Sequence, residues 1–244
     1  MYLYEGFFLC LVLQVNSALI LEGRNITKSY GSLQVLKGIN IKVQKGEIVS
    51  IVGASGAGKS TLLHILGTLD QPDSGEVRLK GEDLFSMRSN QMARFRNLNI
   101  GFVFQFHNLL PEFTALENVC IPGYIGNRPD SEVESQAVNL LTMLGLADRL
   151  HNKPSELSGG EQQRTAVARA LINNPEIVFA DEPSGNLDSR NAGELHELFL
   201  KLRESLDQTF VIVTHNEHLA RLADRILEIQ DGLIVKQVID TNNH

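Results

Sequence analysis

Residues 47–60 read EIVSIVGASGAGKS, a short apolar run followed by three closely spaced glycines, a lysine and a serine. Continuous apolarity predicts a strand buried on both faces. The residues that follow, STLLHILGTL (60–69), have the apolar spacing of a helix. The order strand, G-x-x-x-x-G-K-[ST], helix is the context of a phosphate-binding loop. The stretch therefore predicts an α/β fold in which this loop binds the phosphates of ATP.

Each residue type in the loop has a physical reason to be there. The glycines let the backbone curl until its N–H groups face the phosphate oxygens, and the helix N-terminus adds about half a positive charge. We expect Lys59 to reach the β- and γ-phosphates, Ser60 to bind Mg²⁺ and Thr61 to bond the α-phosphate. The alternative, a glycine-rich tight turn without a ligand, explains neither the lysine nor the serine.

Four further apolar runs are bounded by turn residues and separated by helical patterns. Strand and helix alternation of this kind predicts a mostly parallel sheet with flanking helices, as in RecA-like P-loop NTPases. The runs are IGFVF (100–104), EIVFA (176–180), TFVIVT (209–214) and RILEIQ (225–230).

Two other regions differ from this core. Residues 19–45 alternate more and carry turn signals at Tyr30-Gly31 and Lys37-Gly38, which predicts an antiparallel β subdomain. Residues 107–157 lack a strong strand, contain Pro111, Pro122-Gly123 and Pro154 as breakers, and predict an inserted helical subdomain. We therefore expect one ATP-binding domain over 18–244.

Residues 1–17 do not fit this domain, and we expect them to lie outside the fold, with a start codon placed too early as the simplest cause. Their apolar run, 7–13, is shorter than the ~20 residues needed to span a bilayer. No Lys or Arg precedes Arg24, whereas a secretory signal needs a positive beginning. A membrane anchor is the alternative for this segment.

Composition narrows the function. The chain has 244 residues, 43% of them hydrophobic, and a formal net charge of −7. An acidic balance disfavours a nucleic-acid partner. The two cysteines, Cys10 and Cys120, have no CxxC spacing and form no disulfide framework, which fits a reducing cytosolic setting.

Polar residues follow the predicted strands. Asp181 and Glu182 end one apolar run, Gln105 follows another and His215 follows a third. Ligands of open α/β sheets bind at the carboxyl ends of the strands. We expect Asp181 and Gln105 to hold Mg²⁺. We expect Glu182 to act as general base on the attacking water, and Gln105 and His215 to contact the γ-phosphate. The alternatives are helix capping by the two acids, a surface glutamine at a strand end, and a histidine with satisfied hydrogen bonds at a strand edge.

A second candidate anion site is LSGGEQQR at 157–164. Ser158 and Glu161 fit the capping box S-x-x-E, but a capping box does not need the two glycines between them. Gly159 and Gly160 expose backbone N–H groups to an anion. Because the stretch follows the helical block, we expect it to be too far from its own nucleotide. The simplest resolution is a second copy, packed head to tail, whose nucleotide it covers.

In order and spacing these motifs resemble those of ATP-binding-cassette (ABC) ATPases over about residues 19–235. The resemblance implies the same sandwich dimer, with Ser158 on the partner's γ-phosphate, Asp188 at the dimer seam and Tyr30 stacked on adenine. Glu161 stands where many members have Gln, and Ser184 replaces a common Thr. The expected nucleotide-binding residues are Tyr30, Gly53, Ala54, Ser55, Gly56, Ala57, Gly58, Lys59, Ser60, Thr61, Ser158, Gly159 and Gly160.

Three stretches resemble a narrower group, the LolD, MacB and FtsE type cassettes: QFHNLLPEFTALENV (105–119), PSELSGGEQQR (154–164) and ADEPSGNLDSRNA (180–192). This resemblance implies a peripheral ATPase at the cytoplasmic face of the bacterial inner membrane. Its membrane contact is indirect, through permease subunits of the LolC and LolE kind that dock in a groove of the helical subdomain. The expected groove residues are Phe106, Leu109, Leu110, Phe113 and Leu116, with packing in the subdomain's own core as the alternative.

The resemblance implies that ATP hydrolysis drives release of lipoproteins from the inner membrane for sorting to the outer membrane. The open alternatives are MacB-type export and an FtsE-type role in regulating cell-wall hydrolysis during division. ABC ATPases that act on DNA or ribosomes carry a coiled-coil insertion or two cassettes, and the sequence has neither. A small-molecule kinase would need an acceptor site and would lack LSGG.

Overall fold

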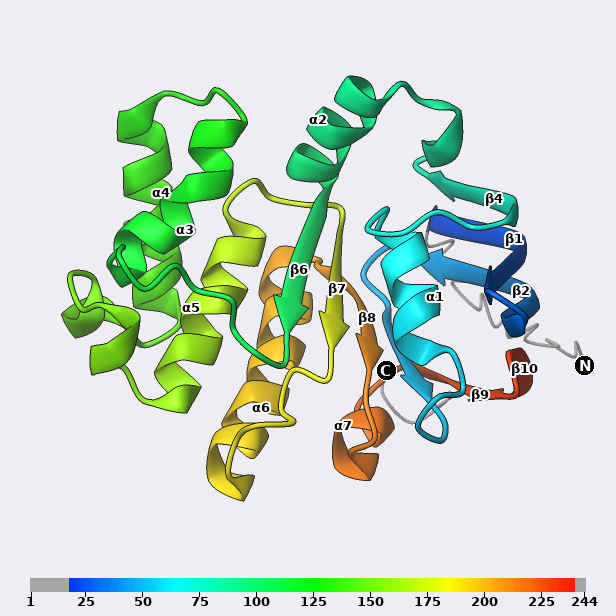
Figure 1. The fold of residues 1–244 in the computed structure, drawn as a ribbon. Coiled ribbons are helices and arrows are strands. Elements are labelled where there is room, and N and C mark those ends of the chain that lie inside the picture. Colours follow the sequence, from blue (N-terminus) through cyan, green and yellow to red (C-terminus); the bar gives the residue numbers. More distant parts are fainter. Residues whose placement is uncertain (1–17, 240–244) are drawn as a thin grey trace, which may run out of the picture.

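The computed structural model describes residues 18–239. The segments 1–17 and 240–244, and with them the predicted N-terminal extension, lie outside the described residues. A six-stranded sheet with the order β10-β9-β3-β8-β7-β6 forms the centre of the fold (Figure 1). Its strands are β3 (Ile48–Val52), β6 (Ile100–Phe104), β7 (Ile177–Asp181), β8 (Thr209–Val213), β9 (Arg225–Gln230) and β10 (Leu233–Ile239).

Five of these strands are parallel, and only β10 runs antiparallel, against β9. β8 illustrates why they read as continuous apolar runs. Val211 and Val213 face one core, Phe210 and Ile212 face the other, and all four are buried. A strand buried on both faces needs apolar residues at every position. The predicted strands match the observed ones to within one residue at each end.

The first core lies between this sheet and a second, antiparallel sheet with the order β2-β1-β4-β5. Its strands are β1 (Leu19–Tyr30), β2 (Leu33–Gln44), β4 (Ser74–Leu79) and β5 (Glu82–Asp83). The turn predicted at Tyr30-Gly31 joins β1 to β2. The turn predicted at Lys37-Gly38 is wrong. Gly38 has φ 98° and lies inside β2, where Ile39 and Lys37 pair with successive residues of β1, so the glycine is the extra residue of a β-bulge.

Helices cover both faces of the central sheet. On the face toward the antiparallel sheet lies α1 (Lys59–Leu66). The helix α2 (Ser89–Asn99) precedes β6, and the sequence did not predict it. The second core packs the other helices against the opposite face. These are α3 (Ala115–Ile125), α4 (Asp130–Met143), α5 (Gly159–Leu171), α6 (Ser189–Leu206) and α7 (Glu217–Arg221).

The block 107–157 contains α3, α4 and short 3-10 turns at Ala147–Arg149 and Pro154–Glu156. A further 3-10 turn, Leu84–Ser86, precedes α2. Pro122 and Gly123 lie inside α3 and do not bound it, contrary to the prediction. A proline there removes one backbone donor. The carbonyl of Pro122 accepts hydrogen bonds from the amides of Asn97 and Asn173, at 3.0 Å each, which ties this part of α3 to the α/β core.

The parallel strands all point the same way, so their carboxyl ends meet at one edge of the sheet (Figure 1). That edge carries the loops in which the sequence places its candidate residues. Within residues 18–239, the model contains no helix with the length and apolarity required to cross a membrane.

Candidate functional site

The loop between β3 and α1 requires glycine at two positions. Gly53 has φ 149°, and a Cβ there would lie 2.2 Å from the carbonyl oxygen of Ile229. Gly58 has φ 101° and precedes α1, and a Cβ there would meet the side chain of Leu36 at 2.8 Å. Larger residues at either position would strain the backbone and collide with β9 or β2. The loop shape is therefore set by packing as well as by turn chemistry.

Lys59 begins α1 and folds back over this loop. Its ammonium donates hydrogen bonds to the carbonyl oxygens of Gly53, at 3.0 Å, and Ala54, at 2.9 Å. The Lys59 ammonium is thus held over the loop, where its N–H groups can reorient toward a bound phosphate. Ala57 is buried, and its backbone N–H donates to the carbonyl of Ala54 at 3.2 Å.

A cavity of about 540 Å³ opens beside the loop. Its size suits a nucleotide-sized ligand. Its lining residues come from β1, β2, the loop, α1 and two strand ends. They are Tyr30, Leu33, Val35, Gly53, Ser55, Gly56, Gly58, Lys59, Ser60, Thr61, Glu182 and His215.

Ser60 and Asp181 form an oxygen-rich pair next to the loop. The Ser60 hydroxyl donates to Asp181 Oδ1 at 3.0 Å, and His64 Nε2 lies 3.6 Å from Asp181 Oδ2. Burial raises the pKa of Asp181 despite the bond from Ser60. Because burial disfavours the ionised carboxylate, a cation beside it would stabilise that form. No cluster of three His, Cys, Asp or Glu side chains occurs in the described part of the chain. The paired Ser60 hydroxyl and Asp181 carboxylate are hard oxygen ligands, which fit Mg²⁺ held by few protein oxygens together with phosphates.

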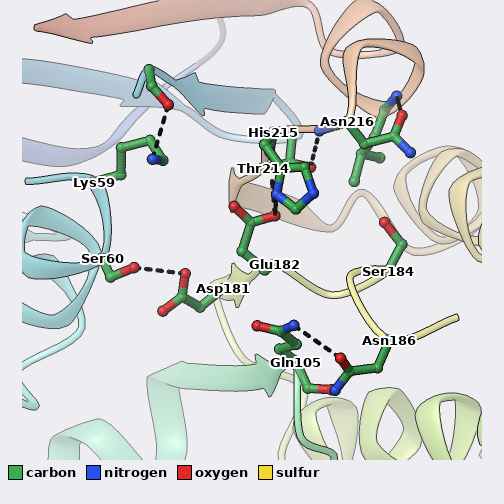
Figure 2. A network of polar contacts seen from close by, with 12 residues as sticks. Lys59, Ser60, Gln105, Asp181, Glu182, Ser184, Asn186, Thr214, His215 and Asn216 are labelled. Atoms are coloured by element: carbon green, nitrogen blue, oxygen red, sulfur yellow. Dashed lines mark hydrogen bonds and ion pairs between the residues drawn. The ribbon is translucent and has the colours of Figure 1, made fainter. Parts of the chain in front are cut away.

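Gln105 follows β6, and its side chain is oriented by Asn186, a residue for which the sequence predicts no role. Its amide nitrogen donates to Asn186 Oδ1 at 3.0 Å, while the Asn186 amide donates to the Gln105 carbonyl at 3.1 Å. In Figure 2 the Gln105 side chain lies beside Asp181 and Glu182, with its nitrogen turned toward Asn186. The position of Asn186 in SGNLD, just after the acidic pair, was the one signal that could have found it.

Glu182 and His215 face each other at the ends of β7 and β8 (Figure 2). Glu182 Oε2 lies 2.9 Å from His215 Nδ1 and accepts the His215 backbone N–H at 3.2 Å. Glu182 also has φ 47°, an uncommon value for a residue with a side chain. Strain of this kind gathers at functional sites. The carboxylate is thus oriented by one backbone donor and by its contact with the imidazole, which is 71% exposed toward solvent.

Tyr30 stands at the end of β1 and lines the cavity. Its ring is about half exposed, and its hydroxyl donates to Asp70 Oδ2 at 2.6 Å. The structure thus places an aromatic face in the lining of the same cavity as the phosphate-binding loop.

The LSGG stretch begins α5 and lies apart from all these groups. Ser158 and Glu161 form the predicted capping box. The Ser158 hydroxyl donates to Glu161 Oε2 at 2.8 Å, and Arg149 donates to Glu161 Oε1 at 2.9 Å. These bonds, Arg149 first, lower the pKa of Glu161 to about 2. None of residues 158–160 lines the cavity, and the start of α5 is well separated from the loop before α1 in Figure 1.

The two glycines of this stretch differ in their surroundings. A Cβ on Gly160 would lie 2.3 Å from Asn191 Oδ1, so α6 packs directly against this position. A Cβ on Gly159 would meet nothing closer than 3.6 Å. Packing in the same chain therefore explains Gly160, and only Gly159 is left with an open approach to its backbone. Asp188 caps α6 by accepting the N–H of Asn191 at 2.9 Å.

The family model described as ABC transporter matches residues 36–185. The chain therefore belongs to the ABC transporter family, as an ATP-hydrolysing cassette that binds nucleotide, and the predicted fold class is confirmed. It is 62% identical to the lipoprotein-releasing system ATP-binding protein LolD of Cytophaga hutchinsonii over 216 residues, which cover 88% of this chain and 99% of that protein. Against the protein of the same name from Porphyromonas gingivalis it is 59% identical, covering 90% and 100% of the two chains.

A solved structure of similar shape is that of the ATP-binding cassette MJ0796, a dimer in a post-hydrolysis state bound to ADP and Pi. The TM-score is 0.82 and the sequence identity 41%, with 90% of this chain and 98% of that chain covered.

Proposed function

We propose that two copies of this chain close head to tail around ATP, each completing the other's site with Ser158. The observation that carries this is the separation of Ser158 from the cavity beside its own phosphate-binding loop. A hydroxyl and an open Gly159 backbone at a helix start are suited to an anion, yet the nucleotide site of the same chain is out of reach. The dimeric structure of the similar cassette MJ0796 supports the arrangement.

Within each site we propose the following roles. Lys59 and the loop N–H groups bind the phosphates, Tyr30 stacks on adenine and Thr61 bonds the α-phosphate. Ser60, Asp181 and Gln105 would hold Mg²⁺, which neutralises charge that develops on the phosphate oxygens.

Hydrolysis needs a water molecule in line with the bond to the γ-phosphate. Glu182 accepts the proton of that water as general base, and the backbone N–H of His215, together with its imidazole 2.9 Å away, keeps the carboxylate in place. His215 also faces the γ-phosphate. The Ser158 hydroxyl of the second copy then stabilises the transition state on the far side.

We further propose that hydrolysis drives a separate permease that releases lipoproteins from the inner membrane, with this chain on its cytoplasmic face. The relatives named for a lipoprotein-releasing system, at 62% and 59% identity, support this assignment. The permease subunits would be of the LolC and LolE kind.

An apolar groove between α2, β6, α3 and α5 offers a place for such a partner to dock. Its lining includes Leu69, Phe102, Phe104, Pro122 and Ile125. None of the five residues predicted for the groove lines it. One of them, Phe106, follows the groove residue Phe104 by two positions in the sequence and is 70% exposed. The groove lies between the helical block and the α/β core. A permease helix bound there would therefore contact both parts and respond when either one moves.

The test is co-purification of tagged full-length chain from detergent-solubilised membranes, with partners identified by mass spectrometry. We expect a permease together with lipoproteins. Ile125→Arg should lose the permease, whereas Met143→Arg, at another exposed apolar position outside the groove, should retain it. Capture of a permease without lipoproteins would overturn the proposed cargo. Capture of the permease by Ile125→Arg at the level of the unaltered chain would overturn the proposed docking groove.

A further inference from the structure

Tyr30 is held more firmly than a half-exposed ring at the end of a strand requires. Its hydroxyl donates to Asp70 Oδ2 at 2.6 Å. Lys28, two residues earlier on the same face of β1, donates to Asp70 Oδ1 at 2.7 Å and to the carbonyl of Gln71 at 2.6 Å. The Lys28 ammonium also lies over the Tyr30 ring, 5.2 Å from its centroid. A single carboxylate therefore fixes both the ring and the cation above it.

Asp70 belongs to the loop that follows α1, the helix that begins with Lys59. This loop is tied to β1 at a second point. Asp73 accepts the backbone N–H of Ser29 at 2.7 Å and donates its own N–H to the carbonyl of Thr27 at 2.9 Å. The same helix thus carries the phosphate-binding lysine at its start and leads at its end into the carboxylate that holds the ring.

The two faces of the Tyr30 ring are not equivalent. Lys28 lies over one face and is not among the residues that line the cavity, whereas Tyr30 is. The face that a planar base can meet from the cavity is therefore the one away from the ammonium.

The charges suit this arrangement. Burial raises the pKa of Asp70, but hydrogen bonds from Lys28 and Tyr30 outweigh it, so the pKa lies below its usual value. The pKa of Tyr30 is raised, first by its bond to Asp70, and the phenol stays a donor. Bonds from neutral or charged donors to an ionised carboxylate are the strong ones.

We propose that Asp70 is a positioning residue for the nucleotide base: by holding Tyr30 and Lys28, it fixes the stacking face at a set distance from the phosphate-binding loop. The proposal rests on the proposed function, in which Tyr30 stacks on adenine. An exposed ring that is already ordered loses less rotamer freedom when the base binds. Asp70 touches no nucleotide itself and acts through Tyr30.

The experiment compares two ligands on the full-length chain. ADP carries the base, and inorganic tripolyphosphate carries phosphates alone. Calorimetry gives ADP affinity, and competition gives tripolyphosphate affinity. We expect Asp70→Ala and Tyr30→Phe each to weaken ADP binding about threefold to tenfold, because a side chain must then be ordered on binding. Tripolyphosphate affinity should stay unchanged. The double variant should bind ADP no more weakly than Asp70→Ala alone, because Asp70→Ala already removes the hydrogen bond that Tyr30→Phe removes.

Two further variants separate the contributions. Asp70→Asn keeps an acceptor for the Tyr30 hydroxyl and loses the charge that pairs with Lys28, so it should bind ADP with intermediate affinity. Glu76→Gln removes a carboxylate from the neighbouring strand, where it pairs with Arg78, and should match the unaltered protein.

The outcomes distinguish this proposal from the one on which it rests. If Tyr30→Ala leaves ADP affinity unchanged, the stacking role itself is wrong. If Tyr30→Ala weakens ADP binding but Asp70→Ala and Tyr30→Phe do not, the positioning role alone is wrong. Equal losses for ADP and tripolyphosphate in Asp70→Ala would mean that the loop after α1 only supports the fold, and would also overturn it. Thermal unfolding of each variant accompanies these measurements.

Discussion

The starts of α1 and α5 are both helix N-termini next to glycines, but they are built in opposite ways. α1 follows Gly58, which provides no side-chain cap, and its first turn contains no acidic residue. α5 follows Ser158, whose side chain caps the helix, and its first turn contains Glu161. The N–H groups of α1 are therefore left for a phosphate. Those of α5 are already partly satisfied within the chain.

This difference indicates that the two helix starts have different roles in binding phosphate. The loop before α1 can bind an anion by itself, because its donors and Lys59 converge on one cavity. The start of α5 has a carboxylate beside it, balanced by Arg149 at 2.9 Å. Such a terminus is suited to contribute one hydroxyl and few N–H groups to a phosphate already held elsewhere. The predictions below test that division.

The largest effect is expected from Glu182→Gln, which removes the general base and keeps the side-chain shape. ATP turnover should fall about 10²–10⁴-fold. ATP binding should persist, so a dimer should accumulate that size-exclusion chromatography detects. Glu217→Gln, an exposed control on α7 that pairs with Arg221, should behave as the unaltered chain. Undiminished turnover by a monomeric Glu182→Gln protein would remove the base from the mechanism.

Ser158→Arg tests whether α5 acts on a partner's nucleotide. Hydrolysis should fall about 10²–10³-fold, as for loss of one transition-state donor, while ADP affinity of the single chain should not change. Ser155→Arg, exposed three residues earlier, is the matched control.

Mixing Ser158→Arg with Lys59→Ala protein sharpens the test, because one of the two composite sites is then intact. Recovered ATPase activity supports the in-trans contact. If Ser158→Arg instead weakens ADP binding as strongly as Lys59→Ala does, the start of α5 belongs to its own chain's site and the comparison above fails.

Lys59→Ala should weaken ADP binding about 10–100-fold, because a charge-assisted contact to phosphate is lost. Calorimetry measures the change. Lys45→Ala removes an exposed lysine paired with Asp207 and should leave the affinity as it was. Unaltered affinity in Lys59→Ala would contradict the assignment of the loop.

The smallest effect concerns Glu161. Its folded pKa of about 2 lies below its ordinary value of 4.5, so the ionised form stabilises the fold fully above pH 4.5 and loses that contribution as the pH falls toward 2. Glu161→Gln keeps the capping bonds but loses the pairing with half-exposed Arg149. It should be less stable by about 1 kcal/mol at pH 7. Urea unfolding at several pH values measures the gap. It should narrow below pH 4.5, and a constant gap would show that charge is not its cause.

Much of the fold could be predicted because the relevant signals are local. The central strands are apolar on both faces, and the phosphate-binding loop is a contiguous motif. The failures are at Lys37-Gly38 and Pro122-Gly123, where a bulge and a helix absorbed residues that usually end an element. α2 escaped prediction because its eleven residues, none of them buried, carry no clear apolar face.

The candidate site divides in the same way. Lys59, Ser60, Asp181, Glu182 and His215 could be predicted because parallel strands bring their carboxyl ends to one edge. Their orienting partners could not. Asn186 meets Gln105 across 81 residues of sequence and Asp70 meets Tyr30 across 40, and no periodicity encodes such pairs.

The sequence by itself determined the phosphate-binding loop, the five parallel strands in their chain order and the capping box of α5, because each depends on residues that are neighbours along the chain. Only the tertiary structure decided that Gly160 packs against Asn191 and that Asp70 holds Tyr30. These are set by how α1, α5 and α6 pack on the two faces of one sheet, which is a property of the whole chain.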